Sequence, residues 1–257
     1  MTPLAAVFPL HDPTGSLTPH LQRLTPDLKR LFSRVYVTVS PQTDARQGER
    51  AQLAQVDFFE LVHNASGSSV GEHLLAGYRR AVEGCVPDAQ LHLCFEDRLI
   101  YALSTEHRAA FMRDVAALRA ERAPILFQRS AAAWRTHPRS YRAIEAMATR
   151  LGEVLFGRSL DWAWCHLAVR AGDLAAALPG LEGIPDISIL AGLVFSLRGR
   201  LVTRDVDWLA WEDPFIFGQD AQALRAARER DPADHEKRLA YVNAMVRLLL
   251  ARSHAEA

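Results

Sequence analysis

Cysteine is scarce in this chain of 257 residues, which holds only Cys85, Cys94 and Cys165. The number is odd, and the spacing matches no common set of metal ligands. Both features argue against a fold held together by disulfide bonds. Because reduced cysteines are typical of proteins that work in a reducing compartment, we expect a cytoplasmic protein.

A long apolar run is also missing. The longest one, residues 187–195, is much shorter than the ~20 residues that a membrane-spanning helix needs, and Arg198 follows it. The first four residues have neither the positive charge nor the cleavage site of a signal peptide. We therefore expect no transmembrane segment and no secretion signal.

Net charge is absent as well, because 30 Lys and Arg residues balance 30 Asp and Glu residues. Without a long-range positive field the chain is not expected to gather polyanions, so no nucleic acid is expected as a partner. The sequence also contains no Walker loop, no H-E-x-x-H zinc motif and no G-x-S-x-G nucleophile elbow. With 49% hydrophobic and 23% charged residues, the composition is that of an ordinary globular protein.

Strands and helices alternate in the first half of the chain. Apolar or β-branched runs predict strands at residues 4–10, 34–40, 56–62 and 90–95. Helical spacing predicts helices at residues 18–32, from about 69 to 83 and at 105–121, and Pro26 is expected to split or kink the first of these. A polar loop is expected at residues 42–55. This alternation predicts an α/β fold with a mostly parallel or mixed sheet flanked by helices.

The second half is more helical. Short strands are predicted at residues 124–128 and 201–205, and long helices at 137–156 and 234–253. The last helix carries an apolar stripe, which we expect to close the core, although a contact in a homo-oligomer is the alternative. We predict one domain over residues 1–257, with a nucleotide-binding half at 1–122 and an acceptor-side half at 123–257.

Polar residues follow the predicted strands at the ends where α/β proteins bind ligands. His11 and Asp12 follow the first strand and Ser40 ends the second. The small-residue loop 63–71 follows the third strand and contains Gly67 and Gly71. A helix that begins near Ser69 would direct its amide groups at an anion, which makes this loop a candidate phosphate site. The alternative is a capped helix after a flexible turn.

The strongest candidate site is the segment Glu96–Asp97–Arg98, directly after the strand at 90–95. Carboxylates at a strand end can hold a Mg²⁺ or Mn²⁺ ion that bridges a diphosphate. The alternative is a loop linked by salt bridges on a solvated face.

Two further clusters are ambiguous. Trp208 and Trp211 either line a pocket in which Glu212 acts as an acid or base, or belong to the core, and we favour the core. A basic cluster after the strand at 124–128 either neutralises a phosphate or is a solvated helix start; it consists of Arg129, Arg135, His137 and Arg139.

Read together, these segments resemble the GT-A fold of the nucleotide-diphospho-sugar transferases. That family carries an Asp-x-Asp motif at the end of its fourth strand, and Cys94–Phe95–Glu96–Asp97–Arg98 is similar to the form Cys-Asp-x-Asp-Arg. On this alignment Asp97 matches the second aspartate and Arg98 the arginine, whereas Phe95 stands in place of the first aspartate. Glu96 could substitute only by a shift of one residue, which in a strand turns a side chain to the other face.

The resemblance implies a glycosyltransferase that moves a sugar from a UDP-, GDP- or ADP-sugar to an acceptor hydroxyl. Arg98 would hold the diphosphate, Asp97 with or without Glu96 would hold a Mg²⁺ or Mn²⁺ ion, and Glu212 would be the catalytic base. The remaining nucleotide-binding residues that it implies are His11, Asp12, Ser40, Asn64, Gly67 and Ser68.

Phe95 leaves several readings open. The transferase is independent of metal, or its metal ligand lies elsewhere, or the chain is a GT-A-like binding or interaction protein that has lost the chemistry. An unrelated Rossmann-type enzyme such as a methyltransferase is disfavoured, because His11–Asp12–Pro13–Thr14–Gly15 is not a run of closely spaced glycines. The donor sugar, the acceptor and the stereochemistry stay open.

Overall fold

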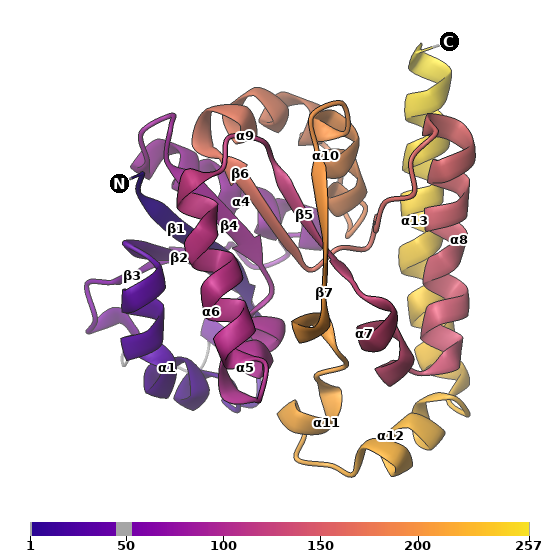
Figure 1. Cartoon of the computed structure of the whole chain (residues 1–257), viewed down its shortest axis with the longest axis horizontal. Helices are drawn as coiled ribbons and strands as arrows, with labels where there is room; N and C mark the ends of the chain where they lie inside the picture. The colour runs from indigo at the N-terminus through magenta and orange to yellow at the C-terminus, as the bar shows by residue number, and fades with distance from the viewer. Residues whose placement is uncertain (1, 45–52, 257) are drawn as a thin grey trace.

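A single mixed sheet of seven strands runs through the part of the chain that the computed structural model describes, residues 2–44 and 53–256. Its order is β3-β2-β1-β4-β6-β5-β7, and helices pack on both faces (Figure 1). The α/β fold with a mixed sheet is therefore confirmed. The predicted loop at 42–55 lies largely outside the described residues.

Six of the seven strands described run in the same direction, and β6 alone runs in the opposite one. The parallel group pairs β3 with β2, β2 with β1 and β1 with β4, whereas β6 runs antiparallel to both β4 and β5, and β7 is parallel to β5. The bounds are β1 (Leu4–Leu10), β2 (Arg34–Val39), β3 (Phe59–His63), β4 (Gln90–Cys94), β5 (Ile125–Arg129), β6 (His166–Arg170) and β7 (Val202–Val206). Central strands covered on both faces need continuous apolar sequence, and every residue of β1 is buried.

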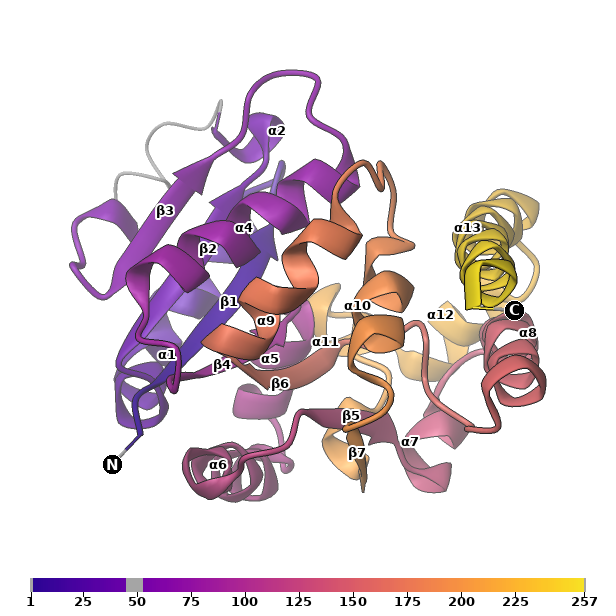
Figure 2. The same cartoon turned by 90° about the horizontal axis from the view of Figure 1, so that it is seen from above.

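Two hydrophobic cores lie on the two faces of the sheet. On one face Leu74 and Tyr78 belong to the same buried cluster as Leu91 and Leu167; on the other, Leu21 and Phe111 belong to the cluster of Phe8 and Val37. The helices of the first face are α4 (Val70–Gly84), α9 (Ala171–Ala177) and α10 (Ile189–Leu197), and those of the second are α1 (Thr18–Leu31), α5 (Glu96–Ser104) and α6 (Arg108–Ala117). Figure 2 shows these two layers from above.

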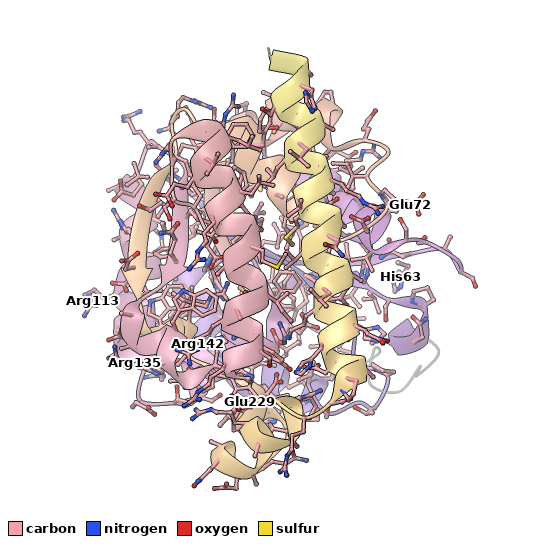
Figure 3. The ribbon with its side chains drawn as sticks, turned by 90° about the vertical axis from the view of Figure 1, so that its right-hand side faces the viewer. His63, Glu72, Arg113, Arg135, Arg142 and Glu229 are labelled. Carbon is pink, nitrogen blue, oxygen red and sulfur yellow. The ribbon has the colours of Figure 1, made fainter. Side chains whose placement is uncertain are left out.

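A pair of long helices stands beside the sheet. α8 (Arg139–Phe156) and α13 (Pro232–Glu256) lie side by side, as Figures 1 and 3 show. Val242, Met245 and Leu249 of α13 are at most 2% exposed, so the expectation that the last helix closes the core is confirmed. The shorter helical segments are α2 (Pro41–Asp44), η1 (Leu118–Ala120), α7 (Ala131–Thr136), η2 (Leu178–Leu181), η3 (Asp207–Leu209), α11 (Asp213–Ile216) and α12 (Ala221–Arg228).

Three local features differ from the predictions. α1 continues through Pro26 without being split, because the buried leucines on its inner face, among them Leu24 and Leu28, hold it on the sheet. Residues 96–104 form a helix and residues 166–170 form the antiparallel strand β6, and neither element was predicted. Among the described residues no helix has both the length and the hydrophobicity needed to cross a bilayer.

Candidate active site

The candidate site lies at the carboxyl ends of the four neighbouring strands β3, β2, β1 and β4. Because these strands are parallel, the residues that follow them meet at one edge of the sheet. His11 follows β1, Ser40 follows β2, Asn64 follows β3 and Phe95 follows β4. The order of the strands thus brings residues from distant parts of the sequence to one edge, as expected.

Three of these residues are joined by hydrogen bonds. His11 Nδ1 lies 3.0 Å from Ser40 Oγ, and the backbone amide of His11 donates to Glu96 Oε1 over 3.1 Å. Glu96 is buried, and burial together with the nearby Asp97 carboxylate raises the pKa of Glu96 to about 8. The raised pKa favours the protonated form of Glu96, and its hydrogen bond to His11 links the segment after β4 to the segment after β1.

Asp12 is engaged with the start of α1. Its carboxylate is buried and accepts hydrogen bonds from the backbone amides of Ser16, Leu17 and Thr18 at 2.8 to 2.9 Å. Amides at a helix start lack partners inside the helix, and a carboxylate there also stabilises the positive end of the helix dipole. Asp12 thus caps the start of α1.

The small-residue loop leads into α4, which begins as predicted after Ser69. Ser69 and Glu72 form a capping box, in which each side chain accepts a hydrogen bond from the backbone amide of the other. Asn64 Nδ2 donates to the carbonyl of Val39 over 3.1 Å, and Ser68 closes a turn onto Ala65. The predicted capped helix is therefore present.

Gly67 and Gly71 serve different purposes in this loop. Gly67 is exposed with φ of 87°, and a side chain there would meet no neighbour within 4 Å. At Gly71 a Cβ would overlap with the carbonyl oxygen of Ile184, and the amide of Gly71 donates to Pro185 O over 3.1 Å. The close approach at Gly71 is made by the chain's own backbone, so the expected approach of a ligand at that position is wrong.

Asp97 and Arg98 lie in the first turn of α5 and line a pocket. Asp97 Oδ1 accepts a hydrogen bond from the backbone amide of Arg98 over 2.7 Å. Burial raises the pKa of Asp97, although the Arg98 guanidinium opposes that shift. The pocket has an empty volume of about 700 Å³, part of it open to solvent.

The pocket is built from both halves of the chain. Phe95 and Asp97 contribute from the end of β4, and Trp164 and Cys165 from the segment that enters β6. α10 and α13 supply an apolar wall that includes Leu190, Val242 and Met245. The antiparallel direction of β6 makes this possible, because the start of β6 lies beside the end of β4.

Glu212 is brought to the site by an ion pair with Arg98. The Glu212 carboxylate is 3% exposed and contacts the Arg98 guanidinium, whose Nη1 also donates to the carbonyl of Ala210 over 3.4 Å. Glu212 is not among the residues that line the pocket. Trp208 and Trp211 are 1% and 4% exposed, so the core interpretation of this motif is confirmed.

A buried network of ion pairs completes the pocket and was missed from the sequence. Arg129 is bound in bidentate fashion by Asp161 at 2.7 to 3.0 Å, and its Nη1 lies 2.7 Å from Glu145. Glu145 also accepts from Arg238 of α13 over 3.0 Å. Arg129 was predicted to belong to a basic cluster, whereas in the structure its side chain is buried and paired with carboxylates. These residues are isolated charges far apart along the chain, and local sequence gives no signal of their pairing.

The residues present offer a limited fit for a metal ion. Among residues 2–44 and 53–256, no group of three or more His, Cys, Asp or Glu side chains is arranged to hold one. Mg²⁺ in nucleotide sites commonly relies on one or two carboxylates together with phosphate oxygens. Asp97 faces the pocket and fits that pattern, whereas Glu96 is turned to His11.

The mixed sheet with helices on both faces is a GT-A type fold, as its likeness to solved structures shows. Glucosyl-3-phosphoglycerate synthase from Mycobacterium tuberculosis, in complex with Mn²⁺, UDP and phosphoglyceric acid, superimposes with a TM-score of 0.59 at 12% identity over 98% of this chain and 78% of that chain. Its complex with Mn²⁺, UDP-glucose and phosphoglyceric acid gives 0.58 at 12% identity, over 98% and 80%.

A mycobacterial protein of known structure gives a TM-score of 0.54 at 14% identity, over 88% of this chain and 75% of that chain. The sequence matches no protein-family model and no curated protein. At such low identities the likeness shows the fold, and the fold is the one that the segments, read together, were found to resemble.

Proposed function

We propose that this protein binds a sugar nucleotide at the carboxyl edge of its sheet and transfers the sugar to an acceptor hydroxyl. The observation that carries the proposal is the position of Asp97 and Arg98, which follow β4 directly and line the 700 Å³ pocket. Structures of the same fold were solved with UDP and UDP-glucose, which supports a UDP-sugar as the first donor to test.

The nucleoside would lie over the ends of β1, β2 and β3. His11 is exposed and presents its ring beside Ser40, and Asn64 lies at the end of the next strand. Asp12 would act indirectly in this arrangement, because its carboxylate fixes the loop after β1. The exposed backbone at Gly67 and Ser68 would approach the ribose or the diphosphate.

Charge compensation on the departing diphosphate is the chemical requirement of the transfer. Arg98 supplies a guanidinium fork at the pocket, a geometry that suits phosphate oxygens. A Mg²⁺ or Mn²⁺ ion bound by Asp97 and the diphosphate would add positive charge at the same point. Asp97 would therefore fix the position of the diphosphate in the pocket.

The acceptor would enter the same pocket from the side of α8 and α13. Arg129 and Arg238 line this part, and both are already paired with carboxylates, so an anionic group of an acceptor would have to displace one of those ion pairs. Structures of the same fold were solved with phosphoglyceric acid, which makes this acid the first acceptor to test. The three cysteines are free, which supports the predicted reducing, cytoplasmic setting.

Glu212 is the candidate base, and its ion pair offers a second role. A base must reach the acceptor hydroxyl, whereas the Glu212 carboxylate contacts Arg98. If Glu212 is the base, Glu212→Gln retains donor affinity and lowers kcat by about 10²–10⁴-fold. If Glu212 instead positions Arg98, the same variant weakens donor binding as well.

Titration calorimetry with nucleotides tests the binding step. We expect UDP, GDP or ADP, or one of their sugars, to bind the parent protein, with Mn²⁺ strengthening the binding. Asp97→Asn should weaken the metal-dependent binding by about tenfold or more, since it removes a charged contact. Asp88→Asn is the control, because Asp88 is 84% exposed. Equal binding by Asp97→Asn and the parent would refute the site.

The alternative is a binding protein of GT-A fold that has lost catalysis. Phe95 favours it, because an aromatic side chain stands where the related motif has its first aspartate. Release of free nucleoside diphosphate from the bound sugar nucleotide, measured over hours with candidate acceptors, separates the two. Binding without release would support the alternative.

A further inference from the structure

A second cavity lies away from the site described above, between α7, α8 and α12. It has an empty volume of about 880 Å³. Four arginines line it: Arg135 of α7, Arg139 and Arg142 of α8, and Arg225 of α12. Figure 3 shows Arg135 and Arg142 on the same side of the molecule, with Glu229 below them.

The positive charge of this cavity is not compensated. Within the described residues none of the four guanidinium groups forms an ion pair, whereas Arg98, Arg129 and Arg238 all do. Arg225 donates to the carbonyl of Thr136 over 2.6 Å. The one carboxylate of the lining, Glu229, accepts from the backbone amide of Arg139 over 2.8 Å. Because the whole chain has no net charge, this excess is a local feature.

A buried histidine, His137, also lines the cavity. His137 is 1% exposed, and its Nδ1 donates to the carbonyl of Ala133 over 3.0 Å. Within residues 2–44 and 53–256 its Nε2 has no hydrogen-bond partner, and neither does the buried Nε of Arg142 or Arg225. Buried polar atoms of this kind take their hydrogen bonds from water or from a bound ligand, and here three of them line one arginine-rich cavity.

The start of α8 adds to the positive potential. α8 has 18 residues, begins at Arg139 and has Pro138 at its N-cap, which offers no side chain to its first amides; Glu229 of the cavity accepts from the amide of Arg139. The positive end of its dipole therefore faces the region where Arg139 and Arg142 lie. Arginine forks and a helix start are a common combination around bound phosphate.

We propose that this cavity binds the singly protonated phosphate group of a small phosphorylated molecule. The guanidinium groups of Arg142 and Arg225 would take the phosphate oxygens, and His137 Nε2 would pair with the hydroxyl of a singly protonated phosphate. The cavity is larger than one phosphate ion, which leaves room for an organic part. This site is independent of the proposed function, because none of its residues is assigned to the sugar-nucleotide site.

Titration calorimetry with inorganic phosphate in a phosphate-free buffer tests the proposal. We expect saturable one-to-one binding to the parent, and Kd values that rise about tenfold in Arg142→Gln and in Arg225→Gln, since each loses a charged hydrogen bond. Arg150→Gln is the matched control, because Arg150 is exposed on the same helix, eight residues and about 12 Å along α8 from Arg142.

Two results would overturn the proposal. One is phosphate binding that is equally strong in both cavity variants and the parent, which would place the ion elsewhere. The other is no saturable binding to the parent. Circular dichroism and thermal unfolding of each variant, compared with Arg150→Gln, show whether a loss of binding comes from loss of the fold. Arg142→Lys, which keeps the charge, should retain part of the affinity.

Discussion

At the scale of single residues, Glu96 and Asp97 show how neighbours in sequence acquire different roles. Both begin α5, yet Glu96 points to the backbone of His11 while Asp97 lines the pocket. Burial raises the pKa of each carboxyl group, and their proximity raises that of Glu96 further. The two acids therefore do not act as one dicarboxylate site.

The raised pKa of Glu96 has a consequence for stability. Its folded pKa of about 8 lies above the ordinary value of 4.5, so between these values the folded state holds a proton that the unfolded chain has released. Stability therefore falls as the pH rises from about 5 to 8. Glu96→Gln removes this loss, and its free energy of unfolding relative to the parent should rise by roughly 1–3 kcal/mol over that range.

Urea unfolding of Glu96→Gln and the parent at several pH values measures this effect. The difference between the two free energies of unfolding near pH 5 is the reference value, because a pKa of about 8 keeps Glu96 protonated in the folded parent there. Parallel pH profiles for the two proteins would show that Glu96 ionises normally in the folded state.

At the scale of elements, the start of α4 is fixed by contact with the loop before α10. Because a Cβ at Gly71 would overlap with Ile184 O, Gly71→Ala should lower the free energy of unfolding by about 1–3 kcal/mol despite the better helix propensity of alanine. Gly199→Ala is the control, since a Cβ at Gly199 meets nothing within 4 Å. Chemical denaturation of both variants measures the difference; equal effects would contradict the packing argument.

β1 was predicted from a long apolar run, and every residue of that strand is buried. β4 is also buried along its length, although Gln90 and His92 interrupt its apolar residues. β6 was missed because its apolar part is only Leu167–Ala168–Val169, between His166 and Arg170. A short antiparallel strand with polar ends has no pattern of its own, and its pairing with β4 depends on tertiary structure.

The residues of the site that follow strands were predictable, because the strands themselves were predicted. His11, Ser40 and Glu96 meet because parallel strands end at one edge, which a sequence of alternating strands and helices already implies. The ion pair of Arg98 with Glu212 joins residues more than a hundred positions apart. Such pairing is set by the folded arrangement of β4, β7 and their following segments, and local patterns do not encode it.

At the scale of the whole molecule, α13 belongs to the fold as an integral element. Leu249 is completely buried, whereas its neighbour Leu250 is 38% exposed. Leu249→Ala should therefore lower the free energy of unfolding by about 2–5 kcal/mol, and Leu250→Ala by less than about 1 kcal/mol. Thermal and chemical unfolding of the two variants measure this contrast. Similar small effects in both would mean that α13 packs loosely.

The direction of β6 also determines when the pocket can form. β6 separates β4 from β5, and more than seventy residues lie between the paired His92 and His166. Before β6 pairs with β4, the backbone N–H and C=O groups along that edge of β4 lack partners and can pair with another chain. Closing so long a stretch of chain is slow compared with local helix formation. The pocket is therefore complete only after β6 has paired with β4.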